Sequence, residues 1–258
     1  AYSCAFNFLV PMAVGAHVYL LGKVPSPKIL LKAFEEVKPN LILTVPLILE
    51  KIYKKMILPQ LSKTTMKVAL NIPLLDSRIY AQIRKKLVDA FGGRFREVIV
   101  GGAAMNEEVT NFLYKIKFPF TIGYGMTECG PLISYDHNDE YVPGSCGQIL
   151  KGIMKVRIDS EDPYNKVGEI QVSGENVMKG YYKNEEATSK VFTEDGWLRT
   201  GDLGTIDADN RIYIRGRSKT MILGASGQNI YPEEIESKLN NLPFVMESII
   251  IEKNGKLV

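Results

Sequence analysis

The segment Tyr124-Gly125-Met126-Thr127-Glu128 brings together several groups that could handle a nucleotide. The flat Tyr124 ring could stack on a base, an interaction worth about 1–3 kcal/mol that does not fix the base's identity. Thr127 could donate a hydroxyl hydrogen bond to a phosphate, and Glu128 supplies the hard oxygen that magnesium prefers. The same residues also fit a glycine-rich surface turn with a helix-capping threonine and a solvated glutamate. The pentapeptide alone leaves both interpretations open.

Thr200-Gly201-Asp202 and Arg217 form a second set of groups, suited to a ribose. The Asp202 carboxylate could accept hydrogen bonds from both ribose hydroxyls. The Arg217 guanidinium could hold ribose or phosphate through its fixed fork of donors. The structural alternatives are an ordinary Gly-Asp turn and an arginine that decorates an edge strand. Neither motif specifies a nucleotide site by itself.

Lys219 is a candidate hinge, because it comes shortly before the small residues Gly224-Ala225-Ser226-Gly227. Hinges absorb large changes in φ and ψ at a few positions next to regular elements. The same composition is also typical of a flexible linker.

The first of these motifs must be positioned by alternating strands and helices. The expected strands span 41–45, 98–100 and 118–122, and the expected helices follow Ser26-Pro27, span 47–56 and 78–91, and begin at Asn106. This alternation predicts an α/β fold with a mainly parallel, helix-covered sheet.

Glycine turns follow two of the expected strands, and their places in the chain suggest a binding crevice. Gly101-Gly102-Ala103 comes after one strand and Gly123 after the next. Ligands of open α/β sheets settle outside the carboxyl ends of the strands, where glycines allow close backbone approach. We therefore expect these turns and Tyr124 to line one crevice.

Beyond Pro143 the pattern changes to short alternating runs separated by turn residues. The expected strands are 154–158, 169–172, 204–207 and 211–214, which predict a small antiparallel sheet or barrel. A small α+β piece follows, with a helix from Pro232, a strand from 245 and an Asn-Gly hairpin turn at 254–255. We predict three parts: the α/β part of a large N-terminal domain over 1–142, a β-barrel-like subdomain over 143–217, and the start of a small C-terminal domain over 218–258.

Composition and charge exclude several classes of protein. A net charge of +3 over 258 residues does not indicate binding to nucleic acid or to an anionic membrane. Three cysteines without a CxxC spacing predict no disulfide framework, no zinc site and a reducing cytosol. The apolar segment 4–21 is long enough to suggest a transmembrane helix, but Pro11 and Gly15 interrupt it. A buried core segment is therefore predicted.

Other nucleotide-binding and hydrolase motifs do not match. Residues 123–128 come within one residue of GxGxxG, but Glu128 replaces the third glycine, which packs helix against strand. The sequences GxxxxGK[ST] and GxSxG do not occur. His17 and His137 are far from any Ser or Cys motif, so each is expected to be structural or on the surface.

Taken together, the motifs resemble the nucleotide-handling segments of adenylate-forming enzymes, and above all the long-chain acyl-CoA synthetases (fatty acid–CoA ligases). The resemblance covers residues 97–240 and extends to residues 1–60. It rests on the order and spacing of Tyr124–Glu128, Thr200–Asp202, Gly216-Arg217-Ser218-Lys219 and Gly224–Gln228, with further matches at Gly168-Glu169-Ile170, Gly174, Gly180-Tyr181-Tyr182 and residues 8–16.

The resemblance implies a role for each site residue. The Tyr124 equivalent stacks on adenine, while the Thr127 and Glu128 equivalents act in catalysis on phosphate and magnesium, with Glu128 as the metal ligand. The Asp202 equivalent binds the ribose hydroxyls, assisted by the Arg217 equivalent. Lys219 corresponds to the pivot of a small domain that rotates between two half-reactions. The remaining positions expected to contact the nucleotide are Gly101, Gly102, Ala103, Gly123, Gly125 and Met126.

The implied activity is ATP-dependent activation of a fatty acid to acyl-adenylate, followed by transfer to coenzyme A. The products are acyl-CoA, AMP and pyrophosphate, and both steps rely on positioning and charge neutralisation rather than on a protein nucleophile. The implied ligands are ATP or AMP, Mg²⁺, coenzyme A and a fatty acid, with no nucleic acid. The expected location is the cytoplasm, and a fatty substrate is compatible with peripheral contact at the inner face of a membrane.

Two alternatives remain open at this point. One is another adenylate-forming ligase that activates an aryl or an amino acid. The other is a nucleotide-binding module without turnover, against which the presence of both Glu128 and Asp202 argues.

The resemblance also implies that parts of the enzyme lie outside this sequence. The family's Ser/Thr/Gly-rich phosphate loop would precede Ala1, and its adenylation lysine would follow Val258. We therefore expect a fragment that folds but does not complete adenylation alone.

Overall fold

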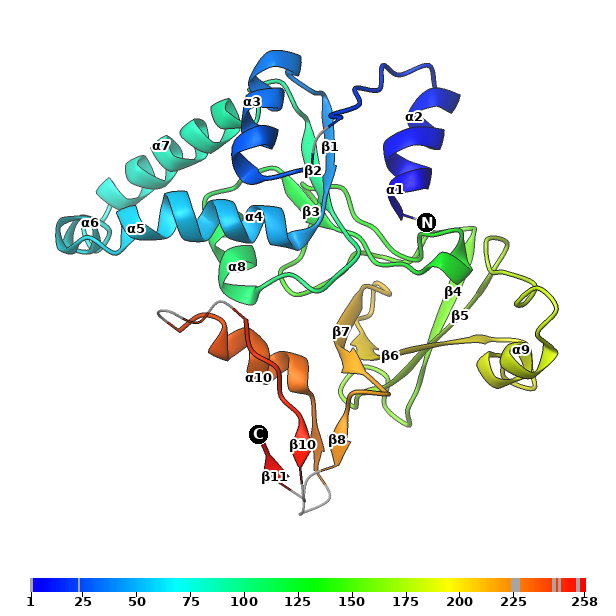
Figure 1. Cartoon of the computed structure of the whole chain (residues 1–258). Coiled ribbons are helices and arrows are strands. Elements are labelled where there is room, and N and C mark those ends of the chain that lie inside the picture. Colours follow the sequence, from blue (N-terminus) through cyan, green and yellow to red (C-terminus); the bar gives the residue numbers. More distant parts are fainter. Residues whose placement is uncertain (1, 23, 224–227, 243–244, 246, 254–255) are drawn as a thin grey trace. The chain divides into compact units, whose positions relative to one another are not determined.

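The structure is a computed structural model that describes residues 2–22, 24–223, 228–242, 245, 247–253 and 256–258 (Figure 1). Its chain divides into two compact units. The first contains residues 1–123 and 136–143, and the second contains residues 124–135 and 144–258. The three-part division with boundaries at 142 and 217 stays a prediction.

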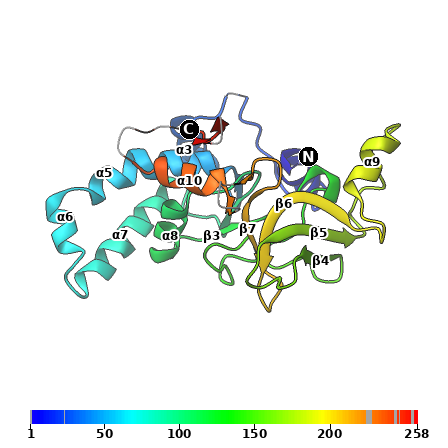
Figure 2. The same ribbon diagram turned by 90° about the horizontal axis from the view of Figure 1, so that it is seen from below.

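The first unit is built on a three-stranded parallel sheet in the order β1–β2–β3. Its strands are β1 (Leu41–Thr44), β2 (Glu97–Val100) and β3 (Phe120–Ile122). β2 and β3 are almost wholly buried, as expected for parallel strands that helices cover. Helices lie beside this sheet in two perpendicular views (Figures 1 and 2). The predicted α/β fold with a parallel, helix-covered sheet is confirmed.

Two helices of the first unit begin where their capping residues predict. Ser26 accepts a hydrogen bond from the Ile29 amide at 3.4 Å and starts α3 (Pro27–Val37). The Asn106 side chain accepts from two amides at 3.0 and 3.3 Å and starts α8 (Glu107–Lys115). The remaining helical elements between α3 and α8 are α4 (Pro46–Ile52), a π-helical turn η2 (Tyr53–Ile57), α5 (Leu58–Leu61), α6 (Thr64–Ala69) and α7 (Leu75–Ala90).

A cluster of phenylalanines fixes α3 and α7 against the sheet. The Phe91 ring, at the end of α7, lies 5.4 to 5.9 Å from the rings of Phe34, Phe95 and Phe118. Tilted and stacked aromatic pairs at these distances add to the gain from burial, which is about 1.5–3 kcal/mol for a phenylalanine. The cluster therefore packs at the amino ends of β2 and β3, opposite the carboxyl ends from which the glycine turns emerge.

The apolar N-terminal segment differs from its prediction. It forms α1 (Tyr2–Cys4), a π-helical turn η1 (Ala5–Leu9) and α2 (Val10–Ala13), and irregular backbone follows. Its large side chains, such as Met12 and Val14, are exposed, so the predicted core burial is wrong. In the described part of the chain, no helix has both the length and the apolar character that crossing a membrane requires.

The second unit contains a four-stranded antiparallel sheet in the order β4–β5–β6–β7, which confirms the predicted change of architecture. Asn184 caps a short helix, α9 (Glu185–Val191), which lies between β5 and β6 in the chain. The strands are β4 (Met154–Asp159), β5 (Gly168–Gly174), β6 (Leu198–Ile206) and β7 (Ile212–Arg217). Thr200-Gly201-Asp202 was expected between strands but lies inside β6, which is longer than its apolar pattern indicated.

The C-terminal part of the second unit is a small α+β segment. It contains β8 (Ile222–Leu223), β9 (Asn229–Ile230), α10 (Pro232–Leu239), β10 (Glu252–Lys253) and β11 (Lys256–Leu257). The helix from Pro232 is confirmed. The strand expected from Val245 is wrong, because among the described residues the first strand after α10 is β10. The expected swivel residues 224–227 and the Asn-Gly turn at 254–255 lie outside the described residues.

Candidate functional site

The glycine turns of the first unit lie at one edge of the parallel sheet. The Gly101 amide donates to Thr44 O at 3.2 Å, and the Gly123 amide donates to Val100 O at 2.9 Å. Since β2 and β3 are parallel neighbours, residues 101–103 and Gly123 leave the sheet side by side. Gly102 has φ +88 with open space around its Cα, so its backbone is accessible to a ligand. Tyr124 starts the second unit, and a shared crevice stays a prediction.

Tyr124, Asp202 and Arg217 come together in the second unit. The Tyr124 hydroxyl donates to Asp202 Oδ2 at 2.7 Å, and Arg217 Nε lies 3.3 Å from Asp202 Oδ1. Tyr124 and Asp202 are buried, whereas the Arg217 side chain is 72% exposed. Asp202 therefore contacts two of the residues expected around the same ribose and base, although 78 residues separate it from Tyr124 in the chain.

Strand pairing explains why Asp202 and Arg217 meet. The two residues are opposite partners where β6 pairs with β7, next to a register shift at Leu203/Gly204. Gly201 has φ +73, a conformation that favours glycine over other residues. The Ser218 amide donates to Gly201 O at 2.9 Å and closes the pairing at this end. The Gly-Asp pair is therefore a bulged strand position, and not the free turn that the structural alternative proposed.

Burial and charge act in opposite directions on the Asp202 carboxyl. Burial raises its pKa, whereas the hydrogen bond from Tyr124 and the positive charge of Arg217 lower it, and nearby Glu233 raises it again. Burial also raises the pKa of Tyr124 well above its ordinary value, and the negative charge of Asp202 adds to this effect. The proton therefore stays on the tyrosine. The carboxylate offers about four lone-pair sites, of which these partners use two.

The Tyr124 ring is packed into the core of the second unit. It is 7% exposed and belongs to a buried cluster that includes Ile133, Ile149 and Ile170. In this structure the ring serves the fold, and its stacking on a base stays a prediction. The contact that the structure does show is the one through its hydroxyl.

Glu128 lies in a short 3₁₀ turn, η3 (Thr127–Cys129), whose shape depends on its neighbours. A Cβ atom on Gly125 would overlap the carbonyl oxygen of Pro131, so the close return of the chain requires glycine there. Asn176 Nδ2 donates to the carbonyl oxygens of Cys129 and Leu132 at 2.6 and 2.8 Å. Thr127 is exposed and Met126 half-buried beside this turn. The turn is thus held from outside by the segment that follows β5.

Tyr181 is a site residue to which the sequence argument gave no role. Its hydroxyl donates to Glu128 Oε1 at 2.9 Å, and the Met178 amide donates to Glu128 O at 2.7 Å. Thr188 in α9 accepts a hydrogen bond from the Tyr181 amide at 2.9 Å and so fixes the loop. The signal in the sequence is Gly180-Tyr181-Tyr182, which matches the family but carries no chemical role of its own.

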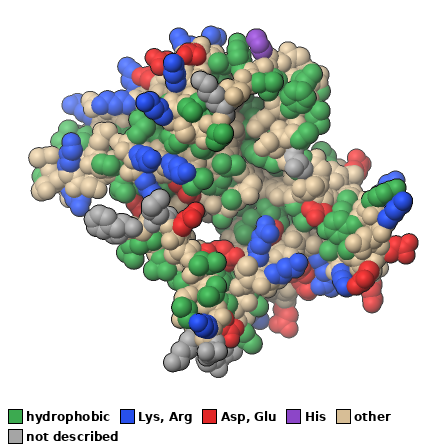
Figure 3. All heavy atoms as spheres, in the orientation of Figure 1, with side chains coloured by type: hydrophobic (Ala, Val, Ile, Leu, Met, Phe, Trp, Pro, Cys, Tyr) green, Lys and Arg blue, Asp and Glu red, His purple; other side chains and the backbone are tan. Residues whose placement is uncertain are grey.

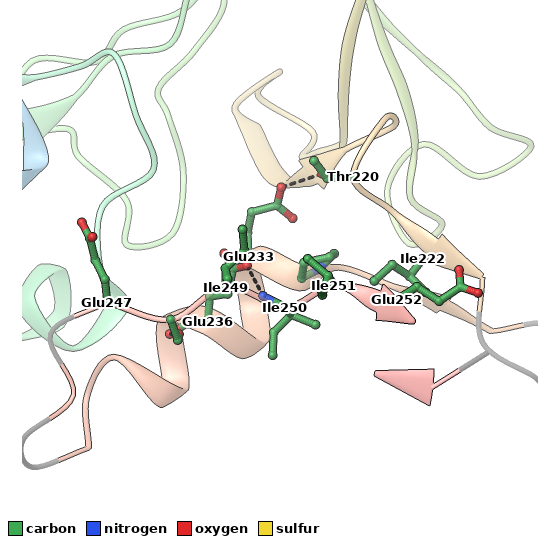
Figure 4. A pocket seen from close by; sticks show the side chains of 11 residues that line it. Thr220, Ile222, Glu233, Glu236, Glu247, Ile249, Ile250, Ile251 and Glu252 are labelled. Carbon is green, nitrogen blue, oxygen red and sulfur yellow. Dashed lines mark hydrogen bonds between the residues drawn. The ribbon is translucent and has the colours of Figure 1, made fainter. Parts of the chain in front are cut away.

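A separate hollow lies in the C-terminal segment and does not suit a nucleotide (Figure 4). Isoleucines line it together with four glutamates, namely Glu233, Glu236, Glu247 and Glu252. Two of these carboxylates have partners: Glu233 accepts from the Thr220 hydroxyl and Glu236 from the Ile250 amide, both at 2.7 Å. Like charges repel, so this lining disfavours phosphates.

The sequence profile of the AMP-binding enzymes matches residues 1–182, which is most of the chain. The chain belongs to the AMP-binding enzyme family. Tyr124 and the Glu128 turn lie within the matched residues, whereas Asp202 and Arg217 follow them. The family is that of the adenylate-forming ligases, as the resemblance implied.

Relatives of this AMP-binding enzyme include ligases for different acids. A long-chain-fatty-acid–CoA ligase of Rattus norvegicus is 26% identical over 96% of this chain and 40% of its own length. A 4-coumarate–CoA ligase of Narcissus pseudonarcissus is 33% identical over 69% of this chain and 35% of its own length. The chain thus spans well under half the length of these curated relatives.

Solved structures resemble this AMP-binding enzyme over nearly its whole length. ATP-bound MatB from Rhodopseudomonas palustris is 28% identical, with a TM-score of 0.70 over 94% of this chain and 43% of that protein. The o-succinylbenzoate–CoA synthetase MenE from Bacillus subtilis, in complex with ATP and magnesium, is 25% identical, with a TM-score of 0.71 over 96% of this chain and 46% of that protein.

The donor set of this AMP-binding enzyme fits a magnesium ion that phosphates help to hold. Among the described residues no group of three or more His, Cys, Asp or Glu side chains could ligate a metal. Mg²⁺ is usually bound through one or two carboxylates plus substrate phosphates, so the single half-buried Glu128 suits it. The exposed Thr127 hydroxyl lies next to it in the chain. These roles stay predictions.

Lys219 is exposed in a turn after β7, in which the Met221 amide donates to Arg217 O at 3.0 Å. Its role as a hinge stays a prediction.

Burial raises the pKa of Cys129 and Cys146 to about 12, so neither thiol forms a nucleophilic thiolate at neutral pH.

Proposed function

We propose that the complete protein activates a carboxylic acid with ATP and transfers the acyl group to coenzyme A. The observation that carries this proposal is the contact of Asp202 with Tyr124 and Arg217 in a member of the AMP-binding enzyme family. A buried carboxylate flanked by a hydroxyl and an exposed guanidinium suits a ribose whose phosphates point toward solvent.

Each residue of the chain would contribute position or charge rather than a covalent bond. Asp202 orients the ribose through its remaining lone pairs, and Arg217 neutralises phosphate charge. Glu128 holds the magnesium ion that accompanies ATP and that supplies charge neutralisation at the phosphates. Tyr181 keeps Glu128 in place. The attack of the substrate carboxylate on the α-phosphate then needs correct alignment, which can supply much of the rate enhancement.

We further propose that the acid is a fatty acid. Long-chain-fatty-acid–CoA ligases from rat and from Saccharomyces cerevisiae align over 96% and 86% of the chain, which supports this choice. The second candidate is an aryl acid, because the 4-coumarate–CoA ligases are more identical over the part that they cover. A nucleotide-binding module without turnover is the third, and the retained Glu128 and Asp202 argue against it.

The test is a panel of acids given to the complete protein with ATP, magnesium and coenzyme A, scored by release of AMP. The panel runs from acetate to palmitate and adds benzoate, 4-coumarate and amino acids. We expect the highest kcat/KM with a long-chain fatty acid. Preference for 4-coumarate would select the aryl ligase, and AMP release with none of the acids would refute the proposed activity.

A further inference from the structure

The charge of the chain is concentrated in one helical segment of the first unit. Residues 51–86, here called the arm, contain nine Lys and Arg and a single Asp, Asp76, a net charge of +8. The whole chain carries +3, so the other residues sum to −5. The whole-chain value therefore hides a strongly basic element inside an otherwise acidic protein.

The arm consists of the end of α4, η2, α5, α6 and most of α7, and it reaches away from the sheet of its own unit. Two perpendicular views place α5 and α6 at the end farthest from β1–β3 (Figures 1 and 2). Lys and Arg side chains gather on the surface over these helices (Figure 3). Lys63 and Lys67, on either side of the start of α6, are exposed.

The end of the arm also exposes large apolar side chains among these lysines. Between residues 51 and 75 the sequence contains no Asp or Glu. The exposed apolar side chains of this stretch are Met56, Val68, Ile72, Leu74 and Leu75. Exposed large apolar side chains combined with lysines and arginines on one helical segment are typical of elements that lie on lipid.

Leu74 shows that this exposure is built into the backbone. It has φ +70, a left-handed conformation that is rare for a bulky residue, and its side chain is 80% exposed. Unfavourable backbone geometry of this kind persists where the surrounding structure enforces it, and it concentrates at functional sites. Here it holds an apolar side chain in solvent next to Ile72 and Pro73.

We infer that the end of the arm, residues 56–75, is a docking surface for an anionic lipid bilayer. Its apolar side chains would enter the boundary between headgroups and acyl chains, while the arm's lysines contact the anionic headgroups. Charge complementarity favours this partner over a neutral surface, because no carboxylate interrupts the lysines of residues 51–75. The inference is independent of the proposed catalytic activity.

The test is flotation of the complete protein with vesicles of equimolar phosphatidylcholine and phosphatidylglycerol, and with phosphatidylcholine vesicles alone. We expect binding to the anionic vesicles only, weakening as salt is added. The double variant Lys63→Gln/Lys67→Gln should bind more than about tenfold more weakly. The matched control Lys151→Gln/Lys155→Gln changes two exposed lysines of the second unit and should bind like the wild type.

A second pair of variants tests the apolar contribution. Ile72→Ser/Leu74→Ser should lose most vesicle binding, whereas Leu20→Ser/Val24→Ser should keep it, although the latter pair is at least as exposed, at 80% and 85%. Unchanged circular dichroism and thermal unfolding would show that each variant folds. Equal binding to neutral vesicles, equal loss from either control pair, or association of the arm with another protein but not with vesicles would overturn the inference.

Discussion

Two tyrosine–carboxylate pairs in the second unit share one geometry and differ in burial. Tyr124 donates to Asp202 at 2.7 Å between buried side chains, and Tyr181 donates to Glu128 at 2.9 Å on a partly exposed surface. A hydrogen bond lost in the interior leaves a stranded partner that water does not reach. The first pair therefore stabilises the fold and also forms part of the candidate ribose site. The hydrogen bond of the second pair can be removed with little loss in the free energy of unfolding.

The largest expected effect comes from removing the charge of the exposed pair. Glu128→Gln in the complete protein should lower magnesium-dependent ATP–pyrophosphate exchange by at least about a hundredfold, or about 2.7 kcal/mol in the barrier. The fold should survive, because the residue is half-buried and its backbone contacts are kept. Glu175→Gln, at an exposed position just after β5, is the control. Normal exchange by Glu128→Gln would assign the cation to another residue.

Removing the buried hydroxyl should act on stability. Tyr124→Phe deprives the buried Asp202 of a donor, and we expect a loss of about 1–3 kcal/mol in the free energy of unfolding. Urea unfolding followed by circular dichroism measures it. A loss as small as that of Tyr181→Phe would mean that the two pairs do not differ in the way their burial suggests.

Removing the exposed hydroxyl should act on the metal. Tyr181→Phe should raise the magnesium concentration for half-maximal exchange by about tenfold and change the free energy of unfolding by less than about 0.5 kcal/mol. Direct titration of the ATP complex with Mn²⁺ provides a readout apart from turnover. Tyr182→Phe removes a hydroxyl from the neighbouring ring, which is 88% exposed, and should change neither quantity. Equal effects from both variants would remove Tyr181 from the site.

The smallest expected effect is on the dependence of stability on pH. The folded-state pKa of Asp202 is raised, so its contribution to stability is fully present below the unfolded value of about 3.9 and is lost as pH rises through the folded value. The difference in unfolding free energy between the wild type and Asp202→Asn should fall across that window. In Tyr124→Phe the window should extend to higher pH, because the hydrogen bond that lowers this pKa is gone. A difference that rises with pH would mean that folding lowers the pKa of Asp202 instead of raising it.

The sequence predicted the elements with local signals and missed those set by tertiary contacts. Ser26 and Asn106 mark helix starts through their own side chains, so α3 and α8 began where expected. β6 extends back to Leu198, through the polar residues 199–202, because pairing with β5 and β7 holds them. The N-terminal helical segment is apolar but exposed. An apolar segment is buried only where another part of the protein packs against it, and composition alone does not show this.

The same distinction between local signals and tertiary contacts applies to the candidate site. Residue types and order identified Tyr124, Asp202 and Arg217, since each carries a group that a nucleotide needs. The sequence had no means of showing that the Tyr124 hydroxyl is bonded to Asp202, or that Tyr181 faces Glu128, because those contacts join residues 53 and 78 positions apart. Such pairs are fixed by the folding of the sheet and the loop after β5.

The hydrogen bond from the Ser218 amide to Gly201 O has a mechanical consequence. It links β6 to the residue that directly follows β7, and Lys219 is the next residue along the chain. A rotation of the C-terminal segment about Lys219 would therefore begin one residue beyond this hydrogen bond. Asp202 and Arg217 would keep their relative positions throughout such a rotation. The C-terminal segment could therefore rotate while a ribose stays bound between these two side chains.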